Sequence, residues 1–370
     1  MSESRIPLLF RANREVASRS IPHDVIFEIT RRCNLDCSMC YVVGHRESHA
    51  DELTTEDAKD ALNQLADAGA LRLTFSGGEP FIRSDFLELV LHAREKTFNI
   101  EIYTNGTLIG PATARRLREL AVWQVSISIL GAEPATHDGI TQSKGSFARA
   151  THAIHLLKEA GVKTRIKTLL MQANFHEYPQ IVAMARDLGI PFSLDPTVSS
   201  RNDGSIDTLE MALTDDQFKE LVADPTLGPG SLSFDNVQLQ ENREDRLNGY
   251  MCRAGVSFCD ISWNGDVLPC MQYPWSAGNL RTQRFADIWA NSPVMLELRA
   301  ARRKSAPECR ECELLPLCFR CPATAALEKG DPLAAYETAC HRARLMDEVR
   351  RARISRETQG AAPLPQREAS

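Results

Sequence analysis

The segment VIFEITRRCNLDCSMCY, residues 25–41, sets the interpretation of the rest of the chain. It opens with a run of β-branched and apolar residues, which predicts a strand, and continues with Cys33, Cys37 and Cys40 in the spacing C-x3-C-x2-C. A loop this short can turn three thiolates toward one centre. Because a closed zinc or four-iron site takes four protein ligands, three thiolates leave one metal position for an exogenous ligand. The segment therefore predicts a reactive metal centre directly after a strand.

Outward from this segment, β-rich runs alternate with amphipathic runs across residues 23–195. The predicted strands are 25–30, 71–75, 99–104, 123–130, 163–171 and 191–195. A helix is predicted to begin at Thr54, because Asp57 three residues later completes a capping box. Further helices are predicted at 84–96, 111–121, 146–160 and 176–188, and near 214–223. Right-handed crossovers allow either a doubly wound sheet or a curved partial barrel, and in both the loops after the strands carry the chemistry.

The composition of the 370 residues, 43% hydrophobic and 25% charged, excludes disorder for most of the chain and suggests two structural units. A net charge of −6 gives no global field that would attract nucleic acid. No apolar run approaches the roughly 18 to 20 residues of a membrane helix, so we expect a cytoplasmic protein without a membrane segment. Thiols stay reduced in the cytoplasm, and the eleven cysteines therefore indicate metal rather than disulfides.

The C-x3-C-x2-C loop after the first strand, followed by Tyr41, resembles the signature of the radical S-adenosylmethionine (SAM) superfamily. The resemblance implies that Cys33, Cys37 and Cys40 hold a [4Fe-4S] cluster whose fourth iron binds SAM. One electron would then cleave SAM to a 5′-deoxyadenosyl radical, which abstracts hydrogen from a substrate. A zinc loop completed by His45 or His49 is the alternative. The resemblance also favours the partial (β/α)6 TIM-like barrel, over about residues 23–200.

A second element supports this resemblance at the end of the second predicted strand. Gly77-Gly78-Glu79-Pro80 matches the GGEP element that binds the SAM amino group in the family. The glycines permit close backbone approach, and Glu79 is acidic where a cation would lie. On the fourth predicted strand Ser126 and Ser128 point to one side of the sheet, and the resemblance places a SAM contact at Ser128.

Eight further cysteines lie in the C-terminal part of the chain, enough for two tetrathiolate sites: Cys252, Cys259, Cys270, Cys309, Cys312, Cys318, Cys321 and Cys340. FCDISWNGDVLPC predicts a hairpin with Asn264-Gly265 as its two-residue turn. That turn places Cys259 directly opposite Cys270, so the two should share one centre. A cross-strand disulfide between them, or paired zinc sites using the C-x2-C spacings, are the alternatives.

The spacing Gly265-x4-Cys270, then C-x2-C-x5-C-x2-C and a distal cysteine, resembles the SPASM extension of radical SAM maturases. The resemblance implies two auxiliary [4Fe-4S] clusters. The first would be held by Cys252, Cys259, Cys270 and Cys321, and the second by Cys309, Cys312, Cys318 and Cys340. The expected organisation is an N-terminal extension (1–22), a radical SAM core (23–200), a connecting region (201–250), a SPASM auxiliary-cluster domain (251–350) and a flexible tail (351–370).

The same resemblance suggests the substrate class. Peptide maturation by cross-linking, epimerisation or oxidation is the first expectation, and modification of a tetrapyrrole, small molecule or sugar is the alternative. Met271 follows Cys270 where sulfatase-maturing relatives have an acid, which disfavours formylglycine formation. The expected partners are a flavodoxin or ferredoxin electron donor and, since only 22 residues precede the first strand, a separate peptide-recognition protein. A non-catalytic zinc-binding interaction module is the remote alternative.

Overall fold

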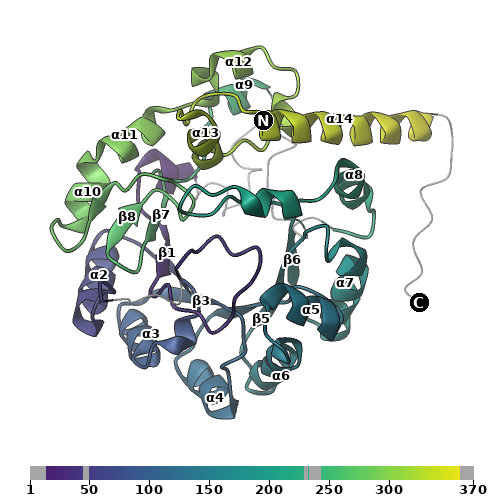
Figure 1. The fold of residues 1–370 in the computed structure, drawn as a ribbon. Coiled ribbons are helices and arrows are strands. Elements are labelled where there is room, and N and C mark those ends of the chain that lie inside the picture. The colour runs from purple at the N-terminus through teal and green to yellow at the C-terminus, as the bar shows by residue number, and fades with distance from the viewer. Residues whose placement is uncertain (1–13, 45–49, 229–231, 233–242, 359–370) are drawn as a thin grey trace.

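The computed structural model describes residues 14–44, 50–228, 232 and 243–358. These residues form a nine-stranded sheet in the order β6-β5-β4-β3-β2-β1-β7-β8-β9, which curves into an open, partial barrel (Figure 1). The strands from β6 to β7 in that order are parallel, and β8 and β9 add antiparallel at one edge. The partial barrel expected from the sequence is therefore confirmed, and the doubly wound sheet is excluded.

The strands are β1 (Asp24–Glu28), β2 (Arg72–Ser76), β3 (Asn99–Thr104), β4 (Gln124–Ser128), β5 (Thr164–Leu169), β6 (Phe192–Asp195), β7 (Phe258–Ile261), β8 (Asp266–Leu268) and β9 (Gly278–Asn279). The helices around the barrel are α2 (Thr55–Asp67), α3 (Phe86–Glu95), α4 (Pro111–Glu119), α5 (Pro134–Thr141), α6 (Ser146–Glu159), α7 (Tyr178–Asp187) and α8 (Asp215–Ala223). The C-terminal helices are α9 (Arg243–Asn248), α10 (Phe285–Asn291), α11 (Pro293–Ala300), α12 (Pro307–Arg310), α13 (Pro322–Lys329) and α14 (Glu337–Thr358).

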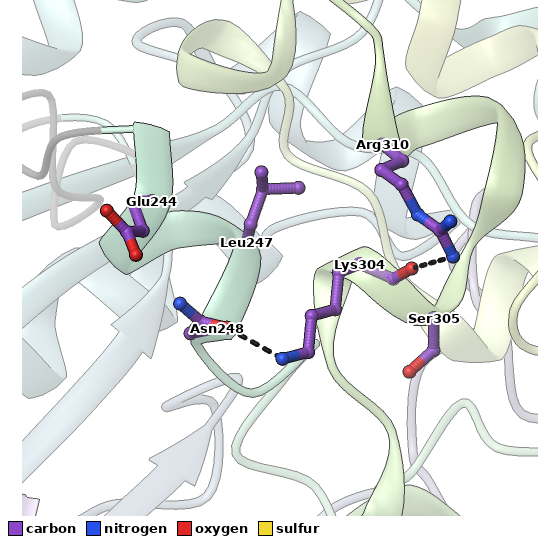
Figure 2. Close-up of a pocket in the computed structure, with 6 residues that line it drawn as sticks. All are labelled: Glu244, Leu247, Asn248, Lys304, Ser305 and Arg310. Atoms are coloured by element: carbon purple, nitrogen blue, oxygen red, sulfur yellow. Dashed lines mark hydrogen bonds between the residues drawn. The ribbon is translucent and has the colours of Figure 1, made fainter.

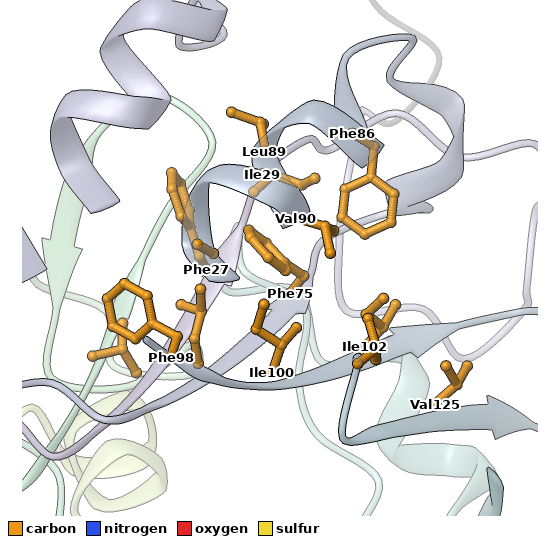
Figure 3. Packing of buried hydrophobic residues seen from close by; sticks show 14 of the residues in the cluster. Phe27, Ile29, Phe75, Phe86, Leu89, Val90, Phe98, Ile100, Ile102 and Val125 are labelled. Carbon is orange, nitrogen blue, oxygen red and sulfur yellow. The ribbon is translucent and has the colours of Figure 1, made fainter. Parts of the chain in front are cut away.

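The main core lies between the outer face of the sheet and the surrounding helices. Phe27, Phe75 and Ile100 from three adjacent strands pack against Phe86 and Leu89 of α3 (Figure 3). These aromatic and branched residues alternate along each strand, so one face is apolar, as a face covered by helices requires. The helix α2 begins with the predicted capping box, in which the Thr54 hydroxyl accepts from the Asp57 backbone.

The opposite, inner face of the sheet is polar. Glu28 of β1, Glu101 of β3, Ser126 of β4 and Lys167 of β5 alternate with the apolar core positions of their strands. A concave polar face next to loops at the carboxyl ends of the strands is where a substrate site forms in β/α barrels.

The strand β7 belongs to the C-terminal half of the chain but pairs with β1 of the barrel. Its register, Val25 with Cys259 and Ile26 with Asp260, continues the parallel sheet. The two halves of the chain therefore share one hydrogen-bonded sheet.

The predicted register of the β7–β8 hairpin is wrong. Asp260 pairs with Leu268 and Ile261 with Val267, so Cys259 does not lie opposite Cys270. The loop has three residues and ends at Gly265, whose φ is +91°. Asn264 is not among the residues with positive φ, and the predicted two-residue turn, which needs positive φ at both central positions, cannot form.

Two helices differ from the expectation. The helix α5 was not predicted, because its short run PATHDGIT has weak periodicity. The helix α14 continues to Thr358, so the segment expected to be a tail from residue 351 begins as helix. Residues 359–370 lie outside the described residues. None of the helices in the described ranges is both long and apolar enough to cross a bilayer.

Candidate functional site

The loop with the first three cysteines leaves β1 and crosses the mouth of the barrel (Figure 1). Its backbone is attached to the end of α5: the Asp36 amide donates to the Thr141 carbonyl at 3.2 Å, and the Ser38 amide donates to the Ile140 carbonyl at 3.0 Å. The unpredicted helix α5 thus positions the cysteine loop.

Arg201, from the segment after β6, holds the other end of the loop. Its guanidinium donates to the Cys40 carbonyl at 2.7 Å and to the Ser38 carbonyl at 3.2 Å, and it forms an ion pair with Asp207. The amide of Asn202 donates to the Tyr41 carbonyl at 2.9 Å. The connecting region is therefore part of the site, a role that its sequence did not indicate.

The three thiols of this loop form one group. Burial, with smaller contributions from Glu79 and Cys40, raises the pKa of Cys33 to about 11. Burial also raises the pKa of Cys37, with added contributions from Cys40 and Cys33. A cationic centre among these thiols would reverse this effect and deprotonate them. The group supplies thiolate ligands alone, which is the donor set of iron-sulfur clusters.

Gly77 and Gly78 lie directly against the backbone that leads into the cysteine loop. The Gly78 amide donates to the Thr30 carbonyl at 2.8 Å, and the Glu79 amide donates to the Arg32 carbonyl at 2.8 Å. A Cβ on Gly77 would lie 2.1 Å from the Thr30 oxygen, and one on Gly78 would lie 2.2 Å from the Arg32 oxygen. Only glycine permits this approach, which fixes the end of β2 to the start of the loop.

The Glu79 carboxylate lies inside the protein, among hydrogen-bond donors. Its side chain is 0% exposed, and its carboxylate accepts from the Thr104 hydroxyl at 2.8 Å and from the Asn105 amide at 2.8 Å. It also accepts from the amide of Phe81 at 3.2 Å, at the start of the short 3-10 helix that opens with Pro80. Burial raises the pKa of Glu79 to about 7, although these donors oppose the shift. Glu79 therefore ties the GGEP turn to the end of β3.

Ser128 lies at the carboxyl end of β4, half-buried on the inner face, where its register partner is Lys167 of β5. Ser126 lies deeper in the barrel and donates to the Glu101 carboxylate at 2.6 Å. Of the two predicted hydroxyls, Ser128 is thus the one nearer the mouth.

Sequence reasoning missed a pair of buried acids below the mouth. Glu28, the last residue of β1, accepts a hydrogen bond from the Tyr41 hydroxyl. Asp260 of β7 is 0% exposed, and neither of its carboxylate oxygens has a hydrogen-bond partner in the described residues. Burial raises the pKa of both acids, that of Glu28 to about 7. Only the pairing of β7 with β1 brings them together, which sequence separation concealed.

Three of the C-terminal thiols form a second group. The residue Cys252 is exposed, but the atoms packed around its sulfur raise its pKa, and the nearby Cys321 thiolate raises it further. Burial also raises the pKa of Cys270, with contributions from Cys321 and then Cys252. Cys270 and Cys321 both pack against Tyr273, Leu298 and Ala323. Cys321 therefore lies with Cys252 and Cys270.

Cys259 is not part of that group. It is 0% exposed and lies in the main core with Val25, its register partner on β1. The charged groups that act on its pKa, after burial, are Asp260 and Arg299 rather than another cysteine. The pairing of β7 with β1 places Cys259 on the outer face of the sheet, opposite to the neighbouring Asp260.

The remaining four thiols form a third group. After burial, Cys340 and Cys312 raise the pKa of Cys309, and Cys309 and Cys340 raise that of Cys318. All eleven cysteines lie within the described residues, and none is in a disulfide. In the described part of the chain no three His, Cys, Asp or Glu side chains are arranged to hold a single metal ion. His45 and His49 lie outside the described residues.

A cavity of about 510 Å³ lies in the C-terminal half, between α9 and the segment that leads into α12 (Figure 2). It is lined by Glu244, Leu247, Asn248, Lys304, Ser305 and Arg310. The Lys304 ammonium donates to the Asn248 side-chain oxygen at 2.8 Å. Charges of both signs line the cavity, which favours no single class of ligand.

Two family models match this chain. The model of the radical SAM superfamily matches residues 27–188, and that of the SPASM iron-sulfur cluster-binding domain matches residues 252–313. Both models imply [4Fe-4S] clusters, and the first implies SAM. The grouped thiols fit these cofactors in donor type.

Similar proteins cover most of the chain. An AdoMet-dependent heme synthase of Methanosarcina barkeri is 29% identical over 86% of this chain and 96% of its own. A PqqA peptide cyclase of Granulibacter bethesdensis is 26% identical over 86% of this chain and 89% of its own. The solved structure of Streptococcus suis SuiB bound to S-adenosylmethionine is 21% identical and aligns with a TM-score of 0.69 over 90% of this chain and 81% of that chain, a likeness of fold. This chain is an enzyme that belongs to the radical SAM superfamily and carries a SPASM iron-sulfur cluster-binding domain.

Proposed function

We propose that this radical SAM enzyme removes a hydrogen atom from a side chain of a tetrapyrrole. The observation that carries the proposal is the match to a heme synthase along nearly the full length of that relative. The match extends through both halves of the chain, including the sheet that β7 completes. A substrate held on the inner face of this sheet would contact residues from both halves.

The proposed cofactor sites follow the thiol groups. Cys33, Cys37 and Cys40 would hold the SAM-binding cluster. The first auxiliary centre would use Cys252, Cys270 and Cys321 without Cys259, and the second would use the four remaining thiols, Cys309, Cys312, Cys318 and Cys340. The proposed core (23–200) and auxiliary-cluster domain (251–350) would then meet at the β1–β7 pairing.

When bound, the cluster and SAM supply the radical that abstracts hydrogen from the substrate. The chain's own residues would position both. Gly77, Gly78 and Pro80 would shape the backbone that receives the SAM amino group, Glu79 would hold that turn in place, and Ser128 would contact SAM from β4. The cysteine loop across the mouth would keep bulk water from the inner face, which protects a radical from side reactions. A flavodoxin or ferredoxin would supply the electron.

The test is deuterium transfer. The reconstituted enzyme is incubated without oxygen with SAM, a reductant and iron coproporphyrin III deuterated in its propionate side chains. We expect 5′-deoxyadenosine that carries deuterium. Formation of 5′-deoxyadenosine without deuterium, at the same rate with and without the porphyrin, would contradict the tetrapyrrole assignment.

Peptide maturation is the second candidate, favoured by the similarity to a PqqA peptide cyclase. It would call for a separate peptide-recognition protein as a partner. The same assay with a deuterated precursor peptide in place of the porphyrin distinguishes the two, because the label enters 5′-deoxyadenosine only from the molecule that reacts.

A further inference from the structure

The strand β5 carries two cationic side chains on the inner face of the barrel. Arg165 and Lys167 alternate with Ile166, which lies in the main core on the outer face. In the sheet register Arg165 is beside Ser126, and Lys167 is between Ser128 of β4 and Ser193 of β6. Both cations therefore face the space where a substrate would lie.

Lys167 reaches across β4 to β3. Its ammonium nitrogen lies 3.4 Å from the centroid of the Tyr103 ring. The Lys167 side chain is half-buried, and this burial lowers its pKa. The aromatic face attracts the cation, but it does not neutralise its charge.

Neither cation has an ion-pair partner in the described part of the chain. The Nε atom of Arg165 is buried without a hydrogen-bond partner. The nearest acids are engaged elsewhere: Glu101 accepts from Gln124 and Ser126, and Asp195 accepts from the Thr197 amide at 2.9 Å. Glu101 and Asp195 act on Lys167 through space without an ion pair, so a hydrogen-bonded anion would supply the direct partner that neither cation has among the described residues.

We propose that Lys167 and Arg165 bind a carboxylate of the substrate on the inner face of the barrel. The identity of that carboxylate as a propionate rests on the proposed function. Ser193, the register neighbour of Lys167 on β6, adds a hydroxyl donor beside it. An ammonium and a guanidinium with a neighbouring hydroxyl are a donor set suited to a carboxylate.

The experiment measures binding rather than turnover. Wild type and the variants K167M, R165M and K163M are reconstituted without oxygen, and each is titrated with iron coproporphyrin III, with its tetramethyl ester and with SAM. K163M is the matched control, since Lys163 precedes β5 and is exposed. Its ammonium nitrogen lies 5.9 Å from the centroid of the Trp123 ring. Iron content checks that each variant is folded and loaded.

We expect K167M and R165M to raise the Kd of the free acid at least tenfold, with no change for the ester or for SAM, and K163M to match wild type. Equal affinity of K167M, R165M and wild type for the acid would overturn the inference. A loss of SAM affinity alone would assign the cations to the carboxylate of SAM and would overturn it as well.

If the wild-type enzyme binds no porphyrin, the proposed function is contradicted. The carboxylate subsite is then tested by a separate experiment. Lysine acetylation of the full chain is then mapped by mass spectrometry with glutarate or dimethyl glutarate present. Protection of Lys167 by glutarate alone, with Lys163 unprotected, supports a carboxylate subsite. Equal acetylation of Lys167 under both conditions overturns it.

Discussion

At the residue scale, two adjacent side chains of β7 lie in opposite environments. Cys259 and Asp260 are adjacent, yet Cys259 lies in the apolar core and Asp260 lies on the inner face with its carboxylate unpartnered in the described residues. A shift of β7 by one residue against β1 would exchange these two environments. The residue type of Cys259 predicts a metal ligand. Whether the thiol can act as one depends on the face of the sheet on which it lies.

The first prediction compares Cys259→Ala with Cys252→Ala. Because Cys259 packs in the core away from the other thiols, C259A should keep the full iron content and cost only about 1 kcal/mol of unfolding free energy. C252A should lose up to about four irons per chain, the content of one cluster. Iron and sulfide analysis of reconstituted protein is the measurement. Equal iron loss in both variants would show that Cys259 is a ligand after all.

The second prediction concerns Thr104, whose hydroxyl donates to the buried Glu79 carboxylate. The pKa of Glu79 is raised to about 7, above its ordinary value of 4.5. The folded chain therefore binds more protons than the unfolded chain between these values, and the stability linked to Glu79 falls as the pH rises through this window. Above about pH 7 the Glu79 carboxylate is charged, and its hydrogen-bond donors then stabilise it most.

The variant T104V should consequently lose about 1–3 kcal/mol of unfolding free energy at pH 8 and less at pH 5.5. Urea unfolding at the two pH values measures this, with T113V on the outer helix α4 as the control. The same loss at both pH values, or an equal loss in T113V, would count against this role of Glu79.

At the element scale, the sequence predicted most of the barrel. The six predicted strands are confirmed within a few residues, because each combines β-branched residues with turn residues at its ends. The helix α5 and the β7–β1 pairing were missed. A short helix without strong periodicity gives little local signal, and a contact between Val25 and Cys259 joins segments too distant for local patterns to reveal.

The candidate site, like the fold, was predictable from the sequence only in part. Closely spaced motifs, such as the cysteine loop and GGEP, are visible in the sequence. Arg201, Asp260 and Lys167 were missed, since each is an isolated charged residue whose importance arises only from the strands and loops that fold around it.

The third prediction tests how GGEP supports the cysteine loop. A methyl group on Gly78 would lie 2.2 Å from the Arg32 carbonyl oxygen, so Gly78→Ala must separate the end of β2 from the loop. We expect G78A to lose about four of about twelve irons per chain and to bind SAM weakly. Gly110→Ala before α4, where nothing lies within 4 Å of the added Cβ, is the control. Normal iron content and SAM affinity in G78A would show that the close approach is not required.

At the scale of the whole molecule, the two halves of the chain share one sheet. The strand β1 has β2 on one side and β7 on the other, and the segment after Ser200 clamps the cysteine loop through Arg201. The helix α14 also reaches back to the barrel side, where Arg342 donates to the Thr197 hydroxyl at 3.1 Å. The C-terminal half is thus part of the barrel's support as well as a carrier of thiols.

The fourth prediction follows from this shared sheet. A chain that ends at residue 250 lacks β7 and leaves β1, a buried central strand, as an exposed edge. Unpaired edges of this kind associate with other chains. Size-exclusion chromatography should show aggregates for this truncation and a defined species for the full chain. A soluble, folded monomer of the truncated chain would contradict the dependence of the barrel on β7.

The most direct test of the account is the metal content of the full chain. The central claim is that the fold gathers ten of its eleven thiols into three iron-sulfur centres. The protein is purified without oxygen, reconstituted with iron and sulfide, and analysed for iron, labile sulfide and zinc. We predict about twelve irons and as many sulfides per chain, about four for each [4Fe-4S] cluster. About four irons together with one or two zinc ions would contradict the account, because the C-terminal thiols would then hold structural zinc.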